Sequence, residues 1–517
     1  MSVRSKLFPN TYRDSVTLMQ LSAEISAREG VQLASAQMAT PANLQLMVDA
    51  GLLETPPDNA APNDLLFVVK GDDGVLDGVT ADFETLLKGV DRKTVAREER
   101  PAGSIAEALQ AAPDANWALV SVPGEYAFAE AMKALRLGLN VMVFSDNVPE
   151  AAEVELKRYA DREGLIVMGP DCGTAIIGGV PLAFANVVAH GGIGVVGASG
   201  TGTQEITTLI DRLGEGVSHA IGTGGHDLSA AVGGLSMCAG IRLLAADPET
   251  RVIVLVSKPP SPAVAERVRA AAGEAGKPVV VCFLGHDGAD LAEGFIAART
   301  LEEAAYRAVA VLRGAPAEFV SAAADDPGVQ QRAKPPASAL APGQKYLRGL
   351  YSGGTFCYEA LLRLRGTLPG ISANIPAEGI MPLANNWKSV GHTLVDLGDD
   401  EFTRGRPHPM IDPSLRMERL LSEAADPETA VILLDVVIGF GAAPDPAGEL
   451  AQVVEKARAL AAADGRTLIV IGFVCGTEKD PQSLSSQRQK LENAGLLLCE
   501  SNAGAVALAG AILGSKP

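Results

Sequence analysis

The chain has 517 residues, of which 47% are apolar but only 4% aromatic, and its formal net charge is −19. So acidic a chain lacks the basic face that binding to nucleic acid or to an anionic membrane requires. No run of about 18 apolar residues predicts a membrane span, and the N-terminus lacks the apolar core of a signal peptide, so we expect a cytoplasmic protein. The six cysteines have no C-x-x-C spacing, which predicts neither a metal site nor a disulfide framework.

The length exceeds what one hydrophobic core can hold, so the sequence predicts roughly three or four domains, of α/β class. Residues 1–100 are expected to form a small α+β module, with helices near 15–30 and 40–51 and strands at 31–38 and 63–71. A charged stretch then marks the end of this module near residue 100.

Residues 101–189 alternate short apolar strands with helices of 10 to 17 residues, a pattern typical of a parallel, Rossmann-like sheet. In such sheets ligands lie outside the carboxyl ends of the strands. The residues expected at these ends, and therefore in a substrate cleft, are Pro123, Asn147, Pro170 and Asp171.

Two further α/β units are predicted at residues 190–318 and 345–517, separated by a linker at 319–344 that is rich in Ala, Pro and Asp. The two units look like copies of one another. "ASGTGTQE", from residue 198, recurs as "YSGGTFCYE", from residue 351, and "ADPETRVIVLVS", from residue 246, recurs as "ADPETAVILLDV", from residue 425. The second copy carries 26 additional residues between these motifs.

Each copy has a glycine-rich turn between a strand and a helix. The candidate anion-binding residues in these turns are Ser199, Gly200 and Thr201 in the first copy and Ser352, Gly353 and Gly354 in the second. Such turns expose N–H groups at the positive end of a helix dipole and suit phosphate or carboxylate. No lysine follows as in a Walker loop, so we expect a small anion. The alternative is that both serines only cap helices, but the duplication favours one shared anion site.

The order of the motifs resembles the succinyl-CoA synthetase superfamily. Residues 104–174, followed by "GIGVVGASGTGTQE", look like the α-subunit of succinyl-CoA synthetase, and residues 345–517 look like the ligase-type domain of its β-subunit. The single chain, with "DLGDDEFTRGRPHPMIDP", is similar to the FdrA proteins over nearly its whole length. The resemblance implies a Rossmann-like CoA-binding-type domain at 101–189 and two flavodoxin-like ligase-type domains, of α-subunit type at 190–318 and β-subunit type at 345–517.

In that family the two glycine-rich helices hold a phosphorylated histidine between them, which implies that the two turns hold phosphate or a like anion. The chain departs from the family in two respects. His286, in "FLGHDGAD", lies too close to the preceding strand to match the phosphohistidine, and residues 1–100 replace the glycine loop that opens the family's CoA-binding domain. CoA is the one cofactor that the resemblance suggests, and no nucleotide-binding domain is recognised.

The additional residues of the second copy supply positive charge. "DEFTRGRPHPM" places Arg404 and Arg406 beside His408, and guanidinium groups bind carboxylate or phosphate through two parallel hydrogen bonds. We expect these three residues to be catalytic. The alternative is that the arginines are solvated or paired with neighbouring acids such as Asp399 and Asp400.

Two classes of function stay open. The FdrA resemblance implies an enzyme subunit that acts on a small anionic carboxylate, by carbamoyl transfer from carbamoyl phosphate as in the oxamate carbamoyltransferase of allantoin breakdown, or alternatively by succinate–CoA ligase-like, NDP-forming acyl-CoA synthesis. It also implies partner subunits, and we expect a homo-oligomer that turns over poorly as the purified chain. The other class is a non-catalytic scaffold that has kept the fold and lost the site.

Overall fold

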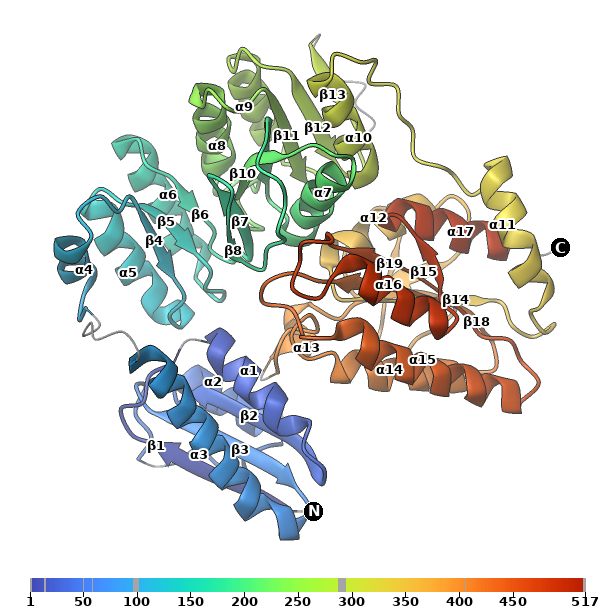
Figure 1. Cartoon of the computed structure of the whole chain (residues 1–517), viewed down its shortest axis with the longest axis horizontal. Coiled ribbons are helices and arrows are strands. Elements are labelled where there is room, and N and C mark those ends of the chain that lie inside the picture. The colour runs from blue at the N-terminus through green and yellow to red at the C-terminus, as the bar shows by residue number, and fades with distance from the viewer. Residues whose placement is uncertain are drawn as a thin grey trace.

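The computed structural model describes residues 2–13, 15–49, 51–57, 59–95, 102–286, 294–404 and 406–514, whose strands form four sheets (Figure 1). The sheets follow one another along the chain as four units. The expected class, multidomain α/β with parallel sheets and a small N-terminal α+β module, is confirmed. No helix in the described part of the chain is long and apolar enough to cross a bilayer. All six cysteines are buried.

The N-terminal module is an antiparallel sheet of order β1-β3-β2 with helices on both faces. Its elements are β1 (Ser2–Phe8), α1 (Ser15–Ser26), β2 (Val31–Met38), α2 (Pro41–Asp49), β3 (Leu65–Gly71) and α3 (Asp73–Val95). The central strand β3 sends Leu65 and Phe67 towards α1 and α3, and Leu66 and Val68 towards α2. The module therefore has its own core. Strand β1 and helix α3 were not predicted from the sequence.

The second unit is the parallel sheet expected from the alternation of strands and helices. Its elements are α4 (Ile105–Ala111), β4 (Trp117–Val120), α5 (Gly124–Arg136), β5 (Asn140–Val143), α6 (Glu150–Glu163) and β6 (Val167–Met168). Lys157 of α6 is fully buried and donates to Glu153 and to Asp227 of the next unit, at 2.7 and 2.9 Å. This buried ion cluster fixes the second unit against the third.

The third unit has the strand order β13-β12-β11-β9-β10, which is the flavodoxin-like order. Its elements are β9 (Ile193–Gly197), α7 (Gly200–Arg212), β10 (Val217–Gly222), α8 (Leu235–Ala246), β11 (Val252–Ser257), α9 (Pro262–Gly273), β12 (Val279–Phe283), β13 (Phe295–Ala297) and α10 (Leu301–Leu312). The hairpin β7 (Thr174–Ile177) and β8 (Val180–Ala183), which the expected boundary at residue 189 leaves in the second unit, joins this sheet because Ile176 pairs with Ala220.

The fourth unit repeats the third with one insertion. Its elements are β14 (Tyr346–Tyr351), α12 (Gly354–Leu364), β15 (Ile371–Ala373), β16 (Met381–Pro382), β17 (His392–Asp396), α13 (Asp400–Thr403), α14 (Ser414–Ala425), β18 (Thr429–Val437), α15 (Pro446–Ala463), β19 (Ile469–Cys475), α16 (Leu484–Asn493), β20 (Leu497–Cys499) and α17 (Asn502–Gly514). Strand β14 lies between β17 and β18, as β9 lies between β10 and β11. By strand order β17 takes the place of β10, so the strands that the fourth unit adds between α12 and β17 are β15 and β16.

The expected linker contains a helix, α11 (Pro327–Ser338), that packs against α17 (Figure 1). Asp326 caps the helix by accepting from the N–H groups of Gly328 and Val329, and Pro327 occupies the first position, where its missing N–H costs nothing. Ala333 is completely buried. Tertiary packing thus outweighs the proline-rich composition that predicted a linker.

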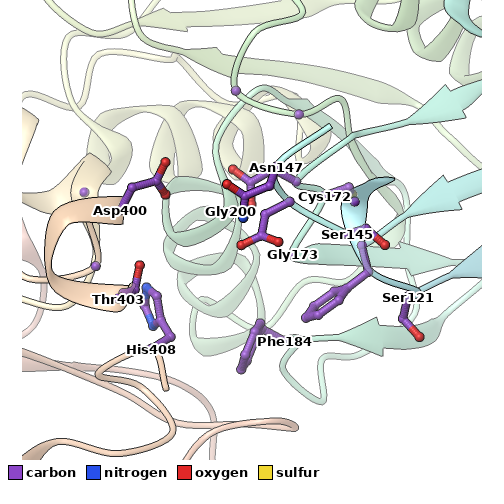
Figure 2. A pocket seen from close by; sticks show the side chains of 18 of the residues that line it. Ser121, Ser145, Asn147, Cys172, Gly173, Phe184, Gly200, Asp400, Thr403 and His408 are labelled. Carbon is purple, nitrogen blue, oxygen red and sulfur yellow. The ribbon is translucent and has the colours of Figure 1, made fainter. Parts of the chain in front are cut away.

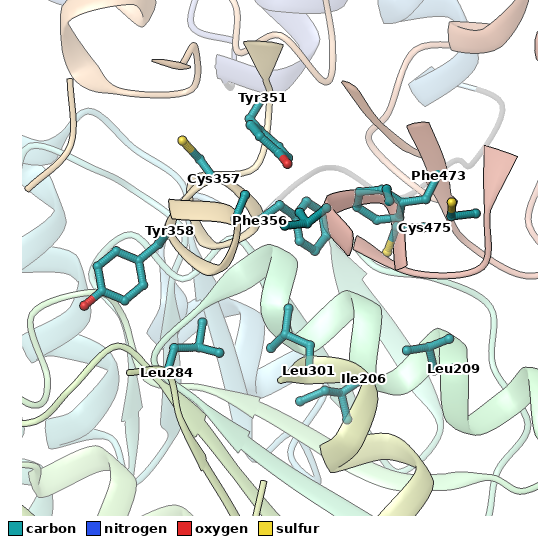
Figure 3. Packing of buried hydrophobic residues seen from close by; sticks show 14 of the residues in the cluster. Ile206, Leu209, Leu284, Leu301, Tyr351, Phe356, Cys357, Tyr358, Phe473 and Cys475 are labelled. Carbon is teal, nitrogen blue, oxygen red and sulfur yellow. The ribbon is translucent and has the colours of Figure 1, made fainter. Parts of the chain in front are cut away.

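The third and fourth units share one hydrophobic core (Figure 3). Ile206, Leu209 and Leu301 contribute to it from the third unit, and Phe356 and Phe473 of the fourth unit pack edge to face within it, with ring centres 5.0 Å apart. Helices α7, α10, α12 and α17 pack against one another across this interface. The duplicated units therefore form an internal pair rather than two separate domains.

Two buried glutamates connect the pair reciprocally. Glu359 of α12 accepts from the N–H of Leu301, the first residue of α10, at 2.8 Å. Glu205 of α7 accepts from the N–H of Asn502, the first residue of α17, at 3.0 Å. Each unit thus supplies a carboxyl group to a helix N-terminus of the other, where the helix dipole favours negative charge.

Candidate functional site

A cavity of about 1120 Å³ lies where the four units meet (Figure 2). The loops that follow strands β4, β5, β6, β9, β11, β14 and β17 all contribute to its wall, so the carboxyl ends of three parallel sheets converge on it. This is where open α/β sheets bind their ligands. The N-terminal module completes the wall with polar side chains that include Ser22, Gln37 and Asn43.

The two glycine-rich turns meet at this cavity, as the duplication predicts. The hydroxyl groups of Ser199 and Thr355 lie 2.6 Å apart and share a hydrogen bond. The turns are so close that a Cβ atom added to Gly353 would lie 2.9 Å from Oγ1 of Thr201. The N-termini of α7 and α12 therefore face one cavity, while binding of an anion there stays a prediction.

The first turn has hydrogen-bond donors to spare. Ser199 caps α7 by accepting from the N–H of Gly202 at 3.0 Å, so the capping role considered above is observed. In the described part of the chain, the N–H groups of Gly200 and Thr201 donate no hydrogen bond. These two groups are the orphan donors that every helix N-terminus leaves.

The second turn differs, because a protein carboxylate already occupies it. Asp435 of β18 accepts from the N–H of Ser352 at 2.8 Å, from its hydroxyl at 2.6 Å and from the N–H of Gly353 at 3.0 Å. Arg416 of α14 donates to Oδ1 of Asp435 at 3.0 Å and to its backbone carbonyl at 2.6 Å. The sequence analysis missed both residues, although Asp435 is visible as a lone charge within an apolar run.

The three residues expected to be catalytic all line the cavity. The guanidinium of Arg406 lies 6.0 Å from the centre of the Trp387 ring, and Arg404 ends helix α13 with its side chain exposed. The alternative of pairing with neighbouring acids is not observed, since no ion pair joins either arginine to a carboxylate within the described residues. Both arginines are therefore placed to meet an anion in the cavity.

His408 is suited to donate a hydrogen bond rather than to act as a base. Its enclosure by protein, with Arg416 nearby, lowers the pKa of His408 to about 4, although Asp435 opposes this shift. The ring is therefore neutral at physiological pH. Its Nδ1 atom accepts from the N–H of Met410 at 3.2 Å, which assigns the proton to Nε2. The ring centre lies 6.3 Å from that of Phe184 (Figure 2).

Three of the four predicted cleft residues, Pro123, Asn147 and Asp171, line the cavity. Pro170 is buried and does not line it. Enclosure within the cavity, together with the negative charges of Asp146 and Asp400, raises the pKa of Asp171 to about 7. A carboxyl group with such a pKa can both accept and release a proton near neutral pH.

Lys258 lines the cavity but was not predicted as a site residue from the sequence. It directly follows β11, and its ammonium lies 5.4 Å from the centre of the Tyr358 ring. The cationic side chains on the described cavity wall are Arg13, Lys258, Arg404 and Arg406. The rule used for residues 101–189, that ligands lie at the carboxyl ends of parallel strands, would have found Lys258 if applied to the third unit.

Comparison with known proteins adds three family matches. The model described as "CoA binding domain" matches residues 189–285, "CoA-ligase" matches residues 350–512, and "AllF, heavy metal-associated domain" matches residues 1–102. The CoA-binding type expected for residues 101–189 stays a prediction, because that match begins at residue 189. Fold, site and matched domains together make the chain a member of the succinyl-CoA synthetase-like superfamily.

The chain belongs to the same family as the uncharacterized protein YahF of Escherichia coli K12, with which it is 44% identical over 511 residues that cover 97% of each chain. It is 30% identical to the succinate–CoA ligase [ADP-forming] subunit alpha 2 of Archaeoglobus fulgidus over 162 residues, which are 30% of this chain and 54% of that subunit. The sulfoacetate–CoA ligase subunit SauD of Bilophila wadsworthia is 28% identical over 28% of this chain and 50% of its own length.

Among solved structures, the dinucleotide-forming acetyl-coenzyme A synthetase 1 of Ca. Korarchaeum cryptofilum, in its apo form, overlaps 77% of this chain and 82% of its own at 13% identity and a TM-score of 0.31. So loose an overlap does not allow individual residues to be compared. The finer expectations from the sequence, membership of the FdrA proteins and carbamoyl transfer, gain no support from the matches. The alternative, a CoA ligase-like activity, fits them better.

The match to a heavy metal-associated domain is not accompanied by the donors that such metals prefer. Residues 1–102 contain neither a cysteine nor a histidine, and soft metals are bound mainly by thiolate and imidazole groups. Within the described residues, no group of three or more His, Cys, Asp or Glu side chains could hold a metal ion. The residues of the module therefore do not fit a heavy metal.

Proposed function

We propose that the chain is the acyl-transfer part of an NDP-forming acyl-CoA ligase that acts on a small carboxylate. The observation that carries the proposal is the hydrogen bond between Ser199 and Thr355, which brings the N-termini of α7 and α12 to one cavity. Two relatives that match 30% and 28% of this chain carry the names of CoA ligase subunits, which supports the proposal. A partner supplies the nucleotide step, since none of the three matched models is described as nucleotide-binding.

The first turn would hold the phosphate of an acyl phosphate. The N–H groups of Gly200 and Thr201 are oriented donors at a helix N-terminus, which stabilises a nearby anion by about 0.3 to 2 kcal/mol. Lys258 and Arg406 supply full positive charges on the same cavity wall. Such fixed donors hold a phosphate leaving group as its charge develops, and they need no reorganisation during the reaction.

The second-unit wall of the cavity suits the pantetheine arm of CoA better than its phosphates. Its second-unit wall offers apolar contacts from Val122, Pro123 and Phe144, which suit a pantetheine arm. The charged side chains that residues 102–189 place on the wall are acidic, so the phosphates of CoA would depend on cations from the other units. CoA, when bound, supplies a thiol that accepts the acyl group. Asp171, with a pKa of about 7, is placed to take up the thiol proton and pass it to water.

The half reaction from acetyl phosphate and CoA to acetyl-CoA and phosphate tests the proposal without any nucleotide. We expect acetyl-CoA to form slowly with the purified chain, and Ser199→Ala combined with Thr201→Ala to lower the rate by about 10-fold or more. Ser352→Ala is the matched control, because the hydroxyl of Ser352 is already bound to Asp435 and should matter less to the rate.

Binding measurements separate this proposal from the scaffold. Titration calorimetry with phosphate, acetyl phosphate and CoA should show binding that depends on Ser199 and Thr201, whereas a scaffold should bind none of them. Parallel titrations with carbamoyl phosphate and oxamate test the alternative substrate pair. Turnover of that pair without any reaction of CoA would overturn the ligase proposal.

A further inference from the structure

The two duplicated turns face different residues on the neighbouring strand. The shared motif aligns "ADPETRVIVLVS" with "ADPETAVILLDV", so that Val256 of β11 corresponds to Asp435 of β18. Next to the first turn, the backbone carbonyl of Val256 accepts from the N–H of Ala198 at 3.0 Å, and its side chain is apolar. Next to the second turn, the equivalent side chain is a carboxylate that reaches the turn itself.

The carboxylate of Asp435 is held as a bound anion would be. Asp435 is completely buried and Arg416 is 2% exposed, and their ion pair has an N–O distance of 3.0 Å. Two backbone N–H groups and the hydroxyl of Ser352 complete the set of donors around it. A guanidinium, a helix N-terminus and a serine hydroxyl are also the groups that proteins use to bind external carboxylates and phosphates.

The remaining donor of the second turn is crowded by another acid. A Cβ atom added to Gly354 would lie 2.3 Å from Oδ2 of Asp396, so the carboxyl group of Asp396 lies directly against the first residue of α12. A second anion at this helix N-terminus would meet two carboxyl groups at close range. Asp435 repels such an anion through its charge, and Asp396, whose pKa burial raises to about 7, does so in its ionised form.

We infer that Asp435 is a built-in anion that fills the N-terminus of α12, so that the protein binds an external anion at the first turn alone. The statement about the first turn rests on the proposed function, whereas the filling of the second turn rests on the contacts of Asp435 only. The pair of turns then has distinct roles. The first turn holds the anion of the substrate, and the second is a fixed, neutralised wall that positions Thr355 against Ser199.

Chemical rescue tests the filling of the second turn. Asp435→Ala leaves Arg416, Ser352 and Gly353 around an empty space, so the variant should unfold at a lower temperature than the wild type. Formate or acetate should raise the melting temperature of the variant by about 2 to 4 °C more than that of the wild type, because a ligand of the folded state stabilises it by mass action. Formamide, which has a similar size but no charge, should not.

A second variant covers the possibility that Asp435→Ala does not fold. Asp435→Val combined with Arg416→Met reproduces the apolar residue of the first copy and leaves no buried charge without a partner. With sulfate as the probe in titration calorimetry, we expect one site in the wild type and a second site in this double variant.

The two proposals fail in different ways. Loss of rescue by formate, together with a single sulfate site in the double variant, would overturn the inference about Asp435. Absence of sulfate binding to the wild type, with rescue of Asp435→Ala intact, would instead overturn the anion site of the proposed function. Two sulfate sites in the wild type would show that the second turn is open and would also overturn the inference.

Discussion

Variants of Arg406 can decide whether this side chain binds the substrate or is only solvated. Its half-buried guanidinium lies on the cavity wall near Trp387, without a carboxylate partner in the described residues. We expect Arg406→Ala to lower kcat/KM by about 3 kcal/mol of transition-state binding, with little change in melting temperature. Arg406→Lys should restore little, because one ammonium cannot form two parallel hydrogen bonds.

Steady-state kinetics of the acyl transfer proposed above, measured with the nucleotide-binding partner if one is isolated, provides the measurement for Arg406. Arg488→Ala is a suitable control. Arg488 does not line the cavity, and it forms an ion pair with Glu500 at an N–O distance of 2.7 Å. If both Arg406 variants keep full activity, the segment around residue 406 is only a solvated surface. The anion site would then consist of the first glycine turn and Lys258.

Asp171 should make anion binding depend on pH. Its pKa in the folded protein is about 7, above the ordinary value of about 4, so its protonated form stabilises the folded state below about pH 4 and this contribution is lost as the pH rises through 7. The same ionisation weakens the binding of an anion in the cavity, because the carboxylate of Asp171 that forms at higher pH repels the anion. We expect sulfate affinity to fall as the pH rises through about 7, and Asp171→Asn to reduce this fall.

Titration calorimetry at several pH values measures this effect, and sulfate is chosen because it does not titrate in that range. His226 also lines the cavity, so a His226→Gln variant is needed to separate the contribution of the histidine. An unchanged pH dependence in Asp171→Asn would show that Asp171 does not face the bound anion.

Asp435 shows why part of the site could not be derived from the sequence. The two turns were recognisable because glycine and serine between a strand and a helix have a local meaning. Asp435 acts on Ser352, 83 residues away, only because β18 lies beside β14 in the register that the fold provides. Such a contact depends on strand order and register, which periodicity does not specify.

At the scale of elements, the reciprocal glutamates should make the internal pair of units sensitive to pH. Burial raises the pKa of both Glu205 and Glu359 above the ordinary value for glutamate. The protonated forms therefore stabilise the folded state, and this stabilisation is lost as the pH rises above the ordinary glutamate range. Oε2 of Glu205 has no hydrogen-bond partner within the described residues. Ionisation of Glu205 should therefore lower the stability of the folded state more than ionisation of Glu359.

We expect Glu205→Gln to lose less stability than the wild type as the pH rises, because glutamine can still accept from the N–H of Asn502 but carries no charge. Between about pH 5 and 8, the difference between the melting temperatures of the wild type and Glu205→Gln should change by roughly 2 to 4 °C. Glu455→Gln, a change at an exposed glutamate of α15, serves as the control. Parallel curves for wild type and Glu205→Gln would contradict this role.

Helices and strands could be predicted where their own residues determine the conformation. They could not be predicted where packing or pairing with other elements determines it. The alternation at residues 101–189 predicted β4, β5 and β6 because buried parallel strands are short apolar runs. Strand β1 was missed because its middle residues are exposed and polar, and its pairing with β3 decides its conformation. Helix α11 was taken for a linker because Pro335 and Pro336 disfavour a helix.

At the scale of the whole molecule, the N-terminal module and the other three units all contribute residues to the wall of the cavity described above. The module has its own two hydrophobic clusters, while the other units are held together by shared cores and by buried ion pairs such as that of Lys157 with Asp227. The module can therefore be removed without breaking the cores of the rest. Its contribution to the site is the polar wall that includes Gln37 and Asn43.

Removal of residues 2–101 should separate anion binding from substrate recognition. The first turn and its helix remain in the shortened chain, so sulfate affinity should change by less than about 3-fold, whereas KM for acetyl phosphate should rise by roughly 10-fold because the open cavity admits water and loses positioning contacts. Circular dichroism and melting curves check that the shortened chain is folded. Gln37→Ala in the full chain is the milder variant and should raise KM in the same direction without altering the melting temperature. If the shortened chain keeps the wild-type KM, the module is not a wall of the working site, and the cavity that matters is formed by residues 102–514 alone.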